Sequence, residues 1–461
     1  MTPHRVAVIG GGLAGLAAAA TLHRLGIEAC VFERDAEVGG VVQSEQRDGW
    51  LIDSGPCMAA EPDAAVRAML DTAGLAECTL RAGPGANHRY IVHDGVPVPL
   101  PQTTAEFTVS PLLSLAGRLR LLKERFIPAQ RDATDESVDS FARRRFGDEV
   151  ADRMFDPLVA STCAGDPRQV LARYAFPQLV GHEQHGGSGL QGNLRDRMEA
   201  RRQAKGKPTG AWSCLQGMHE LPLRLASRVA TIRTSAPVDA ASARDGKVHV
   251  GVGGRTSEAF DAAIFAVPAP ALGRIAFDLP EADRLMQVAT MPQASIAAVS
   301  LGFRRDHIVH PLDAARLLVP SVERRSILSV VFPSSVFAGR APDDHVLVTA
   351  FVGGARRPDL VDLPEADLIA LVQLELGSLL GVQGPAVMQR VTVWRDALPQ
   401  AVAGHGGRLA AADVVEATAG VVAFTGAWRD GLSVAEVLLG GVRAAERLAV
   451  RQGWPSLPTS G

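Results

Sequence analysis

Apolar residues in the first 33 positions follow a pattern that predicts a strand, a helix and a second strand. Val6–Ile9 is an unbroken apolar run of the length expected for a buried strand. The stretch Leu16–Leu25 is rich in Ala and Leu, which favour helices, and Gly26 ends it. A second apolar run, Glu28–Phe32, closes on the acidic residue Glu33. This order of elements predicts an α/β fold.

A glycine-rich turn joins the first strand to the helix. Gly10, Gly12 and Gly15 form the pattern G-x-G-x-x-G, which allows a tight turn, close approach of a pyrophosphate, and packing of helix on strand. The N-terminus of the helix that follows would present free N–H groups and the positive end of the helix dipole to phosphate. Glu33 is placed to accept hydrogen bonds from a ribose. The turn predicts a dinucleotide site, and a purely structural glycine turn is the alternative.

The residues after Glu33 favour FAD over NAD. The pair Gly39-Gly40 lies six residues past the acid. A glycine pair in this place is typical of FAD-binding flavoproteins with two dinucleotide-binding domains. We therefore expect FAD as the cofactor.

The rest of the chain alternates between helical and strand-like patterns. The expected elements are a hairpin of residues 41–43 with 49–52, a helix over 63–75, a hairpin of 88–92 with 96–100, helices over 134–144 and 148–160, a solvated helix and loop over 193–207, a short helix over 217–225, strands at 231–232, 248–252, 262–267, 295–303, 344–352 and 421–424, and a helix over 433–448.

One stretch, Pro111–Phe126, predicts an amphipathic basic helix. Leu and other apolar residues recur at helical spacing and are interleaved with Arg118, Arg120, Lys123 and Arg125. The first interpretation is a helix packed on its own domain with a solvated basic face. The alternative is contact with an anionic membrane surface.

Composition narrows the class of protein. A chain of 461 residues, 47% hydrophobic and 21% charged, suggests two or three globular domains. A net charge of −3 provides no field for nucleic acid. The five cysteines form no C-x-x-C pair and predict reduced thiols in a cytoplasmic protein. We expect no signal peptide, because the dinucleotide motif accounts for the apolar N-terminus, and no membrane-spanning helix.

Two charged motifs suggest other chemistry. His182-Glu183-Gln184-His185 resembles a zinc motif but has the wrong histidine spacing, so we expect no metal site. Arg143-Arg144-Arg145 is too short for nucleic acid and predicts a solvated helix face or a contact with an acidic partner.

Several stretches outside the glycine-rich turn resemble a known family. They are D-E-S-V-D-S-F with R-R-F-G over residues 135–147, F-D-P-L-V with A-G-D-P over 155–167, A-F-P with H-G over 175–186, and F-V-G-G-A-R over 351–356. With the FAD motif they make the chain, from Val6 to about Leu448, resemble the protoporphyrinogen oxidase family of the amine-oxidase-like FAD superfamily.

The resemblance implies an α/β architecture of three parts. A Rossmann-type FAD-binding domain would comprise residues 1–85, 212–290 and 395–455. A mixed-sheet substrate domain would comprise 86–104 and 291–394, and a helical insertion domain, the part that would touch a membrane, 105–211.

The resemblance also implies the cofactor positions. The ADP half of FAD would lie against Gly10, Gly12, Leu13, Ala14, Gly15, Glu33, Arg34, Gly39 and Gly40, with Val238 near the adenine. Gly55-Pro56 would lie against the flavin. The C-terminal segment that closes over pyrophosphate and flavin would contribute Gly426, Gly431, Ser433 and Val434.

Three residues are candidates for the substrate. Arg89 falls where some family members carry an arginine that pairs with a propionate of the tetrapyrrole, and a planar guanidinium suits a carboxylate. A solvated arginine on an edge hairpin is the alternative. Leu318 and Phe332 match the region that sandwiches the rings, and plain core packing is their alternative.

The chain departs from the family pattern at four places. Cys57-Met58 replaces a polar pair, Thr162-Cys163 replaces a tyrosine-containing segment, and Ala401 replaces a tyrosine. The C-terminal segment over residues 426–434 reads G-A-W-R-D-G-L-S-V where the family has a sequence close to G-N-x-Y-x-G-V-G-L, so Ser433 replaces a glycine. These differences bear on the substrate more than on FAD binding.

The implied reaction needs little acid–base equipment. A porphyrinogen has sp³ bridging carbons between electron-rich pyrroles, so a meso C–H can leave as hydride to flavin N5, and O₂ would reoxidise the flavin. The resemblance thus implies oxidation of protoporphyrinogen IX or coproporphyrinogen III in haem biosynthesis. The alternatives are a flavin oxidase or desaturase acting on another metabolite, and a non-catalytic relative that binds FAD or a tetrapyrrole. We expect a cytoplasmic monomer or homodimer, in the membrane-contact alternative peripheral to the inner face of the cell membrane.

Overall fold

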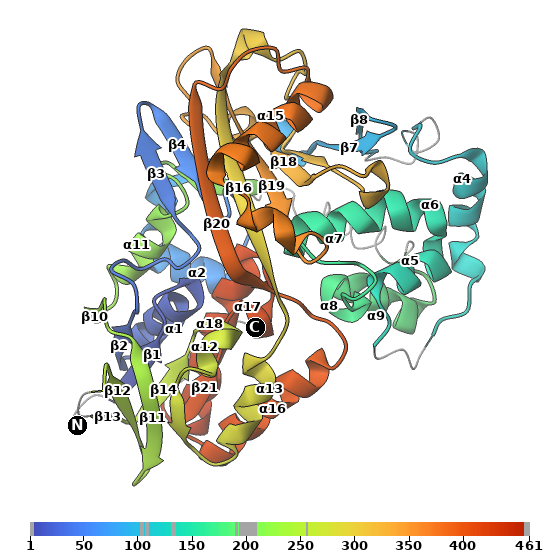
Figure 1. Cartoon of the computed structure of the whole chain (residues 1–461). Coiled ribbons are helices and arrows are strands. Elements are labelled where there is room, and N and C mark those ends of the chain that lie inside the picture. The colour runs from blue at the N-terminus through green and yellow to red at the C-terminus, as the bar shows by residue number, and fades with distance from the viewer. Residues whose placement is uncertain are drawn as a thin grey trace.

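A parallel five-stranded sheet is the centre of one half of the molecule (Figure 1). The computed structural model describes residues 4–101, 106, 110–130, 135–189, 192, 210–254 and 257–455. The sheet has the order β10-β2-β1-β14-β21, and its strands are β1 (Arg5–Ile9), β2 (Glu28–Phe32), β10 (Thr231–Arg233), β14 (Ala262–Phe265) and β21 (Val422–Phe424). These strands confirm the expected runs at both ends of the chain. The arrangement is the Rossmann-type α/β fold expected from the sequence.

Two helices cover one face of this sheet. Val6 and Val8 point toward α1 (Leu13–Arg24) and α18 (Val434–Arg451), where they pack with Ala18 and Leu448. Glycine lets the two helices approach closely, because a Cβ at Gly441 would lie 2.2 Å from the carbonyl oxygen of Ala14. The smaller helices α2 (Ala64–Thr72) and α11 (Glu220–Ala226) complete this layer.

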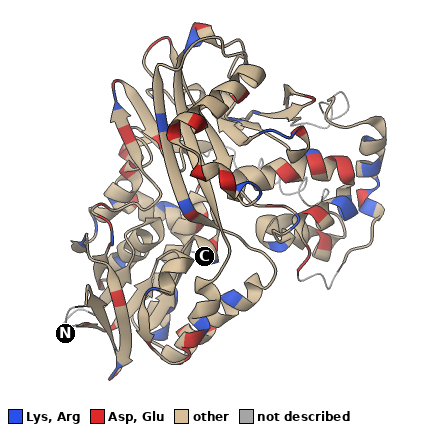
Figure 2. Ribbon diagram, viewed as in Figure 1, with Lys and Arg blue, Asp and Glu red and all other residues tan. Residues whose placement is uncertain are grey.

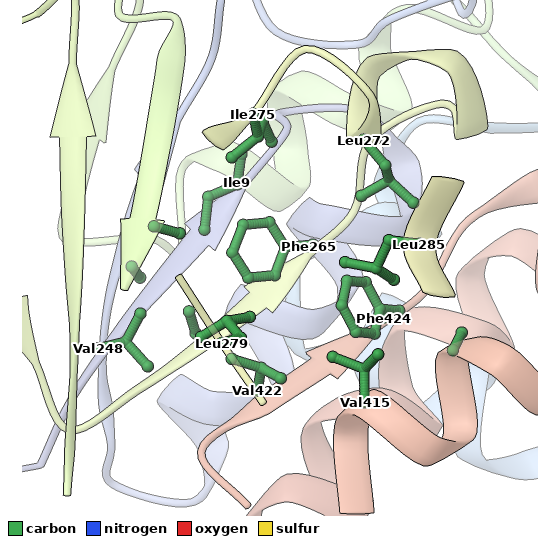
Figure 3. Packing of buried hydrophobic residues seen from close by; sticks show 14 of the residues in the cluster. Ile9, Val248, Phe265, Leu272, Ile275, Leu279, Leu285, Val415, Val422 and Phe424 are labelled. Carbon is green, nitrogen blue, oxygen red and sulfur yellow. The ribbon is translucent and has the colours of Figure 1, made fainter. Parts of the chain in front are cut away.

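The opposite face carries the largest apolar cluster of this half. Ile9, Phe265 and Phe424 point into it, and the rings of Phe265 and Phe424 stack with centroids 5.5 Å apart (Figure 3). The covering elements are β11 (Val238–Arg244), β12 (Lys247–Val252), β13 (Glu258–Phe260), β15 (Ala276–Asp278), α12 (Ala269–Leu272), α13 (Leu285–Ala289) and α16 (His405–Ala419). Successive residues of β1 therefore face opposite layers, as expected for a strand buried on both sides.

A mixed seven-stranded sheet forms the second part. Its order is β20-β16-β19-β18-β17-β7-β8, with β7 (Arg89–His93), β8 (Val96–Pro99), β16 (Gln293–Arg304), β17 (Arg316–Leu318), β18 (Ile327–Val331), β19 (His345–Gly353) and β20 (Met388–Pro399). The proline-containing hairpin β7–β8 lies at the sheet edge, as predicted. One face packs on α15 (Glu365–Leu380).

The third part is helical and lies beside the mixed sheet (Figure 1). Its core contains the rings of Phe141, Phe146 and Phe155. Its helices are α4 (Leu115–Leu122), α5 (Val138–Phe146), α6 (Asp148–Val150), α7 (Asp156–Cys163), α8 (Ala172–Ala175) and α9 (Pro177–Gly186). The helix expected over 134–144 begins only at Val138, because the Ser137 side chain accepts a hydrogen bond from Ser140 N and caps it.

Two expected elements need correction or lie outside the described residues. The first strand of the hairpin expected at 41–43 is β3 (Ser44–Arg47), paired with β4 (Trp50–Asp53). Residues 41–43 instead form a loop beside the glycine-rich turn, because Val42 N donates to the Gly39 carbonyl. The segment expected at 193–207 lies outside the described residues. A small three-stranded sheet of β5 (Ala59–Ala60), β9 (Ala211–Cys214) and β6 (Thr79–Arg81) completes the fold.

The amphipathic helix exposes most of its apolar residues, contrary to the first interpretation, although Leu121 packs toward the helical core. No residue of α4 is buried, and Leu115, Leu119 and Leu122 are 72%, 53% and 67% exposed. Arg120 instead faces the protein and donates hydrogen bonds to carbonyls at the C-terminal end of α5, where the helix dipole favours a cation. The described residues include no helix long and apolar enough to cross a membrane.

The run Arg143-Arg144-Arg145 is not a solvated face. Arg143 pairs with Asp139 and Asp152, and the other two arginines pair with acids of neighbouring elements, including Glu183. Both signs of charge are mixed in this part of the molecule (Figure 2). The three cations are therefore neutralised within the fold. These arginines leave no unpaired charge that would support the expected contact with an acidic partner.

Candidate functional site

The carboxyl edge of the parallel sheet collects the glycine-rich turn and the C-terminal turn. Gly10 N donates 2.8 Å to the Phe32 carbonyl at the end of β2. A Cβ at Gly15 would lie 1.9 Å from the Gly10 carbonyl oxygen, so only glycine permits this contact of α1 with β1. Thr425 N donates 3.0 Å to the Phe265 carbonyl, which places Gly426 beside the end of β14. Ligands of open α/β sheets bind at this edge.

The N-terminus of α1 is open. Gly12 is the N-cap residue, no side chain caps the helix, and no atom lies within 4 Å of the place a Cβ would take. Gly39-Gly40 lies alongside, since Gly39 N donates 2.9 Å to the Gly11 carbonyl. Leu13 and Ala14 begin the helix, so their N–H groups belong to its unpaired first turn. An open, uncapped helix start between two glycine pairs fits a pyrophosphate.

Glu33 follows β2 at the same carboxyl edge of the sheet, and its side chain is only 8% exposed. Its Oε2 accepts a hydrogen bond of 2.6 Å from Gly11 N, and its Oε1 accepts one of 2.8 Å from Asp35 N. Ala236 N donates 2.8 Å to the Glu33 carbonyl, which brings the start of β11 at Val238 next to the acid. The ribose and adenine positions predicted from the sequence are thus adjacent. The Arg34 side chain does not join this site, because it is exposed and pairs with its neighbour Asp35 at 3.3 Å.

The segment predicted to lie against the flavin is fixed from two sides. Ser54 N donates a hydrogen bond of 2.9 Å to the Gln43 carbonyl, and the Ser54 carbonyl accepts one of 2.8 Å from Trp394 Nε1 on β20. A Cβ at Gly55 would lie 2.0 Å from the Val41 carbonyl oxygen. Gly55-Pro56 is therefore held between the loop after Gly40 and the mixed sheet. Nothing in the sequence near Trp394 indicated this role.

The C-terminal turn accommodates the departure at Ser433. Gly426 N donates 2.8 Å to Asp430 Oδ2, and Gly431 has a φ of 118° that disfavours other residues. Ser433 has an ordinary extended φ of −73°, and its hydroxyl caps α18 in a capping box with Glu436. Val434 follows and is buried against the α1 layer. Serine thus replaces the family glycine at a position whose backbone does not require glycine.

A buried ion pair lies beside the flavin segment and was not predicted. Asp53 accepts from Met218 N at 2.8 Å, and its Oδ2 lies 3.7 Å from Nε of the fully buried Arg340. Burial raises the pKa of Asp53 above its usual range, while Arg340 opposes the rise. Asp53 Oδ2 and two Arg340 nitrogens have no hydrogen-bond partner among the described residues. The charges of Asp53 and Arg340 are balanced within the fold, next to the segment predicted to lie against the flavin.

The mixed sheet presents one face away from α15, and strand register assigns its residues. Arg316 pairs with Arg89 on one side and with Val331 on the other, and Leu318 pairs with Ile91 and Ser329. Leu318 is buried against residues that include Leu158 of α7, so α7 covers this face.

The prediction that Phe332 lies on this face is wrong. Phe332 is fully buried in the cluster on the opposite face, against α15 and the His310 ring. Phe351 is the aromatic residue in register with Ser329, so it shares the face of Leu318, and its side chain is half-buried. The alternation along β19 was the signal that could have identified it.

The thiols near this face are not activated. Burial raises the pKa of both Cys57 and Cys163 to about 11. Both thiols are therefore neutral at pH 7 and are poor nucleophiles. Glu183 of the zinc-like motif pairs with Arg144 and Arg145, which leaves it unsuited to a metal.

A parallel sheet with a glycine-rich turn, an open helix start and a buried acid at its carboxyl edge defines a Rossmann-type dinucleotide-binding protein. The comparisons with known proteins are more specific. Residues 13–449 match the family model described as flavin containing amine oxidoreductase. The chain is 31% identical to mitochondrial protoporphyrinogen oxidase of Nicotiana tabacum over 96% of this chain and 94% of that protein. It is 26% identical to coproporphyrinogen III oxidase of Bacillus subtilis, over 94% and 95%.

Solved structures agree in fold. A provisionally assigned protoporphyrinogen oxidase from Exiguobacterium sp. 255-15 superposes with a TM-score of 0.80 at 23% identity, over 98% of this chain and 100% of that one. Reduced UDP-galactopyranose mutase superposes with a TM-score of 0.74 at 17% identity, over 98% and 94%. The chain belongs to the flavin-containing amine oxidoreductase family and is an FAD-dependent oxidoreductase.

Proposed function

We propose that this chain oxidises a porphyrinogen, protoporphyrinogen IX or coproporphyrinogen III, to the porphyrin in haem biosynthesis. The observation that carries the proposal is the position of Arg89. It lies on the face of the mixed sheet that also bears Leu318 and Phe351, and that α7 covers. A tetrapyrrole with propionates needs both a cation and apolar walls. Similarity to relatives named for these two substrates extends over nearly the whole chain.

The chain's residues would bind, orient and shield the substrate. Bound FAD supplies a two-electron acceptor for the substrate's bridging carbon. Gly12, Glu33 and Gly39 would hold its ADP half, and Gly55-Pro56 would lie against its flavin. Arg89 would pair with a propionate, and α7 would exclude water from the sheet face. Because Cys57 and Cys163 are neutral at pH 7, no thiolate would compete for the reaction.

Anaerobic mixing tests the proposal. FAD-loaded protein is mixed separately with protoporphyrinogen IX and coproporphyrinogen III, and the visible flavin absorption is followed. We expect bleaching, then porphyrin fluorescence above a protein-free control when air is admitted, which also tests O₂ as the acceptor. The substrate that bleaches the flavin faster is assigned. A bound flavin that neither compound reduces would contradict the proposal and favour a flavin oxidase or desaturase acting on another metabolite, or a non-catalytic relative.

We further propose that α4 rests on an anionic membrane surface, which would place the protein peripherally on the cytoplasmic side. Support comes from Leu119, Leu122 and Phe126, which point outward and are 53%, 67% and 70% exposed, beside exposed Lys123 and Arg125.

Vesicle flotation tests the membrane contact. We expect the protein to float with vesicles of mixed neutral and anionic lipid, and the variant Leu119→Ser/Leu122→Ser to remain in the soluble fraction. Replacement of the exposed Leu374 of α15 by Ser is the control, because it removes an equally apolar residue elsewhere. Equal flotation of all three proteins would refute the contact.

A further inference from the structure

Arg316 lies where three distant segments of the chain meet. It opens β17, and its register neighbour on the parallel strand β7 is Arg89. Its Nη1 donates a hydrogen bond of 3.3 Å to the carbonyl of Ser161 on α7. Cys57, the residue after Gly55-Pro56, lies close enough to affect the pKa of Arg316. The guanidinium is therefore placed between the mixed sheet, the helical part and the candidate flavin segment.

This cation has no anionic partner in the part of the chain that the structure describes. Among the described residues, no carboxylate oxygen lies within 4.0 Å of a guanidinium nitrogen of Arg316, the distance that defines an ion pair. Burial lowers the pKa of Arg316, and the like charge of Arg89 lowers it further. Cys57 cannot act as the counterion, because burial raises the pKa of its thiol to about 11 and leaves it neutral at pH 7.

A purely structural role accounts for only part of this arrangement. The bond to Ser161 caps the last turn of α7, where a cation is favourable. However, a guanidinium carries five donors, and this is the one hydrogen bond that the described residues provide to it. A neutral donor would cap the helix without placing a half-buried charge next to a second arginine. A half-buried guanidinium without an anionic partner is stabilised when a carboxylate reaches it.

We propose that Arg316, with Arg89, forms a paired-guanidinium site for carboxylates on neighbouring pyrrole rings of the substrate. Side chains of register neighbours on adjacent strands start about 4.8 Å apart, so each guanidinium can take its own propionate. Arg316 is the positioning residue that turns the propionate-bearing edge of the tetrapyrrole toward the Cys57 side of the site. The inference rests on the proposed function and adds a specific contact to it.

Binding of a porphyrin and its ester tests the inference without turnover. FAD-loaded protein is titrated with coproporphyrin III and with its uncharged tetramethyl ester, and the quenching of porphyrin fluorescence gives both Kd values. For Arg316→Met we expect the Kd of the free acid to rise about tenfold to a hundredfold, the effect of losing a charged hydrogen bond. The Kd of the ester should stay unchanged, and Arg316→Lys should recover part of the loss.

Two further variants separate charge from structure. Arg316→Gln keeps a donor for the Ser161 carbonyl but not the charge, so it should lose acid binding like Arg316→Met. Arg304→Met removes one charge from an exposed ion pair with Asp306 at the end of β16 and should change neither Kd. In turnover, Arg316→Met should raise KM for the free acid with little change in kcat.

The outcomes are distinct. Equal weakening of acid and ester, or unchanged acid binding in Arg316→Met and Arg316→Gln, would overturn the inference while wild-type flavin reduction still supports the proposed function. Wild-type protein that binds the free acid through Arg316 but is reduced by neither porphyrinogen would instead overturn the proposed function.

Discussion

At the scale of single residues, burial decides which charges the fold tolerates. His405 is 5% exposed, packs edge-on against the Tyr174 ring, and has no hydrogen-bond partner for Nδ1 among the described residues. Burial, with Arg408 and Arg173 nearby, lowers its pKa to about 4. The folded protein thus holds this imidazole neutral, whereas the unfolded chain protonates it near its ordinary pKa of 6.5.

His405 should therefore contribute to acid sensitivity. Its contribution to stability is fully present above pH 6.5 and is lost as the pH falls toward 4, at up to about 1.4 kcal/mol per pH unit. We expect the difference in free energy of unfolding between wild type and His405→Gln to shrink by up to about 3 kcal/mol between pH 7 and pH 4. Denaturant unfolding at several pH values measures it. The exposed His185→Gln is the control, and a pH-independent difference would contradict the assignment.

The residue scale also shows which site predictions depend on local sequence and which depend on strand pairing. The glycine-rich turn could be predicted because its function follows from local backbone geometry. Phe332 and Phe351 both lie in apolar runs, and only strand pairing showed that Phe332 faces α15 while Phe351 faces α7. Arg316 was overlooked because its neighbours in the sequence are apolar, and its partners come from residues 57, 89 and 161.

At the scale of secondary-structure elements, the helix pair α1 and α18 positions the cofactor site. The helices touch where Gly441 meets the Ala14 carbonyl, within the first turn of α1. The contact leaves no room for a methyl group, since a Cβ would also lie 2.9 Å from the Ala17 Cβ.

Gly441→Ala should therefore destabilise the protein by about 1–3 kcal/mol and weaken FAD binding, because α1 must move. The matched control is Gly407→Ala in α16, where no atom lies within 4 Å of the new Cβ. That change should stabilise the helix by up to about 1 kcal/mol. Denaturant unfolding and FAD titration measure both variants. Similar effects of the two substitutions would refute close packing as the reason for Gly441.

At the scale of the whole molecule, the helical part is docked on the mixed sheet through a buried acid. Asp156 opens α7 and is 5% exposed. It accepts hydrogen bonds from Ser321 N at 2.8 Å and Ser321 Oγ at 3.0 Å, and it pairs with Arg356 after β19. This cluster holds α7 over the sheet face that bears Arg89 and Arg316.

Asp156→Asn should leave Arg356 without its anion and destabilise the protein by about 2–3 kcal/mol. It should also raise KM, because α7 is less firmly held over the site. Asp359→Asn is the matched control, since its pair with Arg357 is exposed and worth less than about 1 kcal/mol. Unfolding midpoints and steady-state kinetics measure both. A KM unchanged in Asp156→Asn would separate the docking of α7 from substrate binding.

The sequence by itself determined the strand–turn–helix start, the FAD motif, most of the strands and the family, because each depends on local periodicity or on residues close together in the chain. The tertiary structure decided what depends on orientation. Apolar residues of α4 are exposed, and the arginines of α5 are paired with acids. Phe351, and not Phe332, lies on the sheet face of Leu318, and Arg316 lies beside Arg89. Strand pairing and helix docking set these outcomes, and both join residues that are distant in the chain.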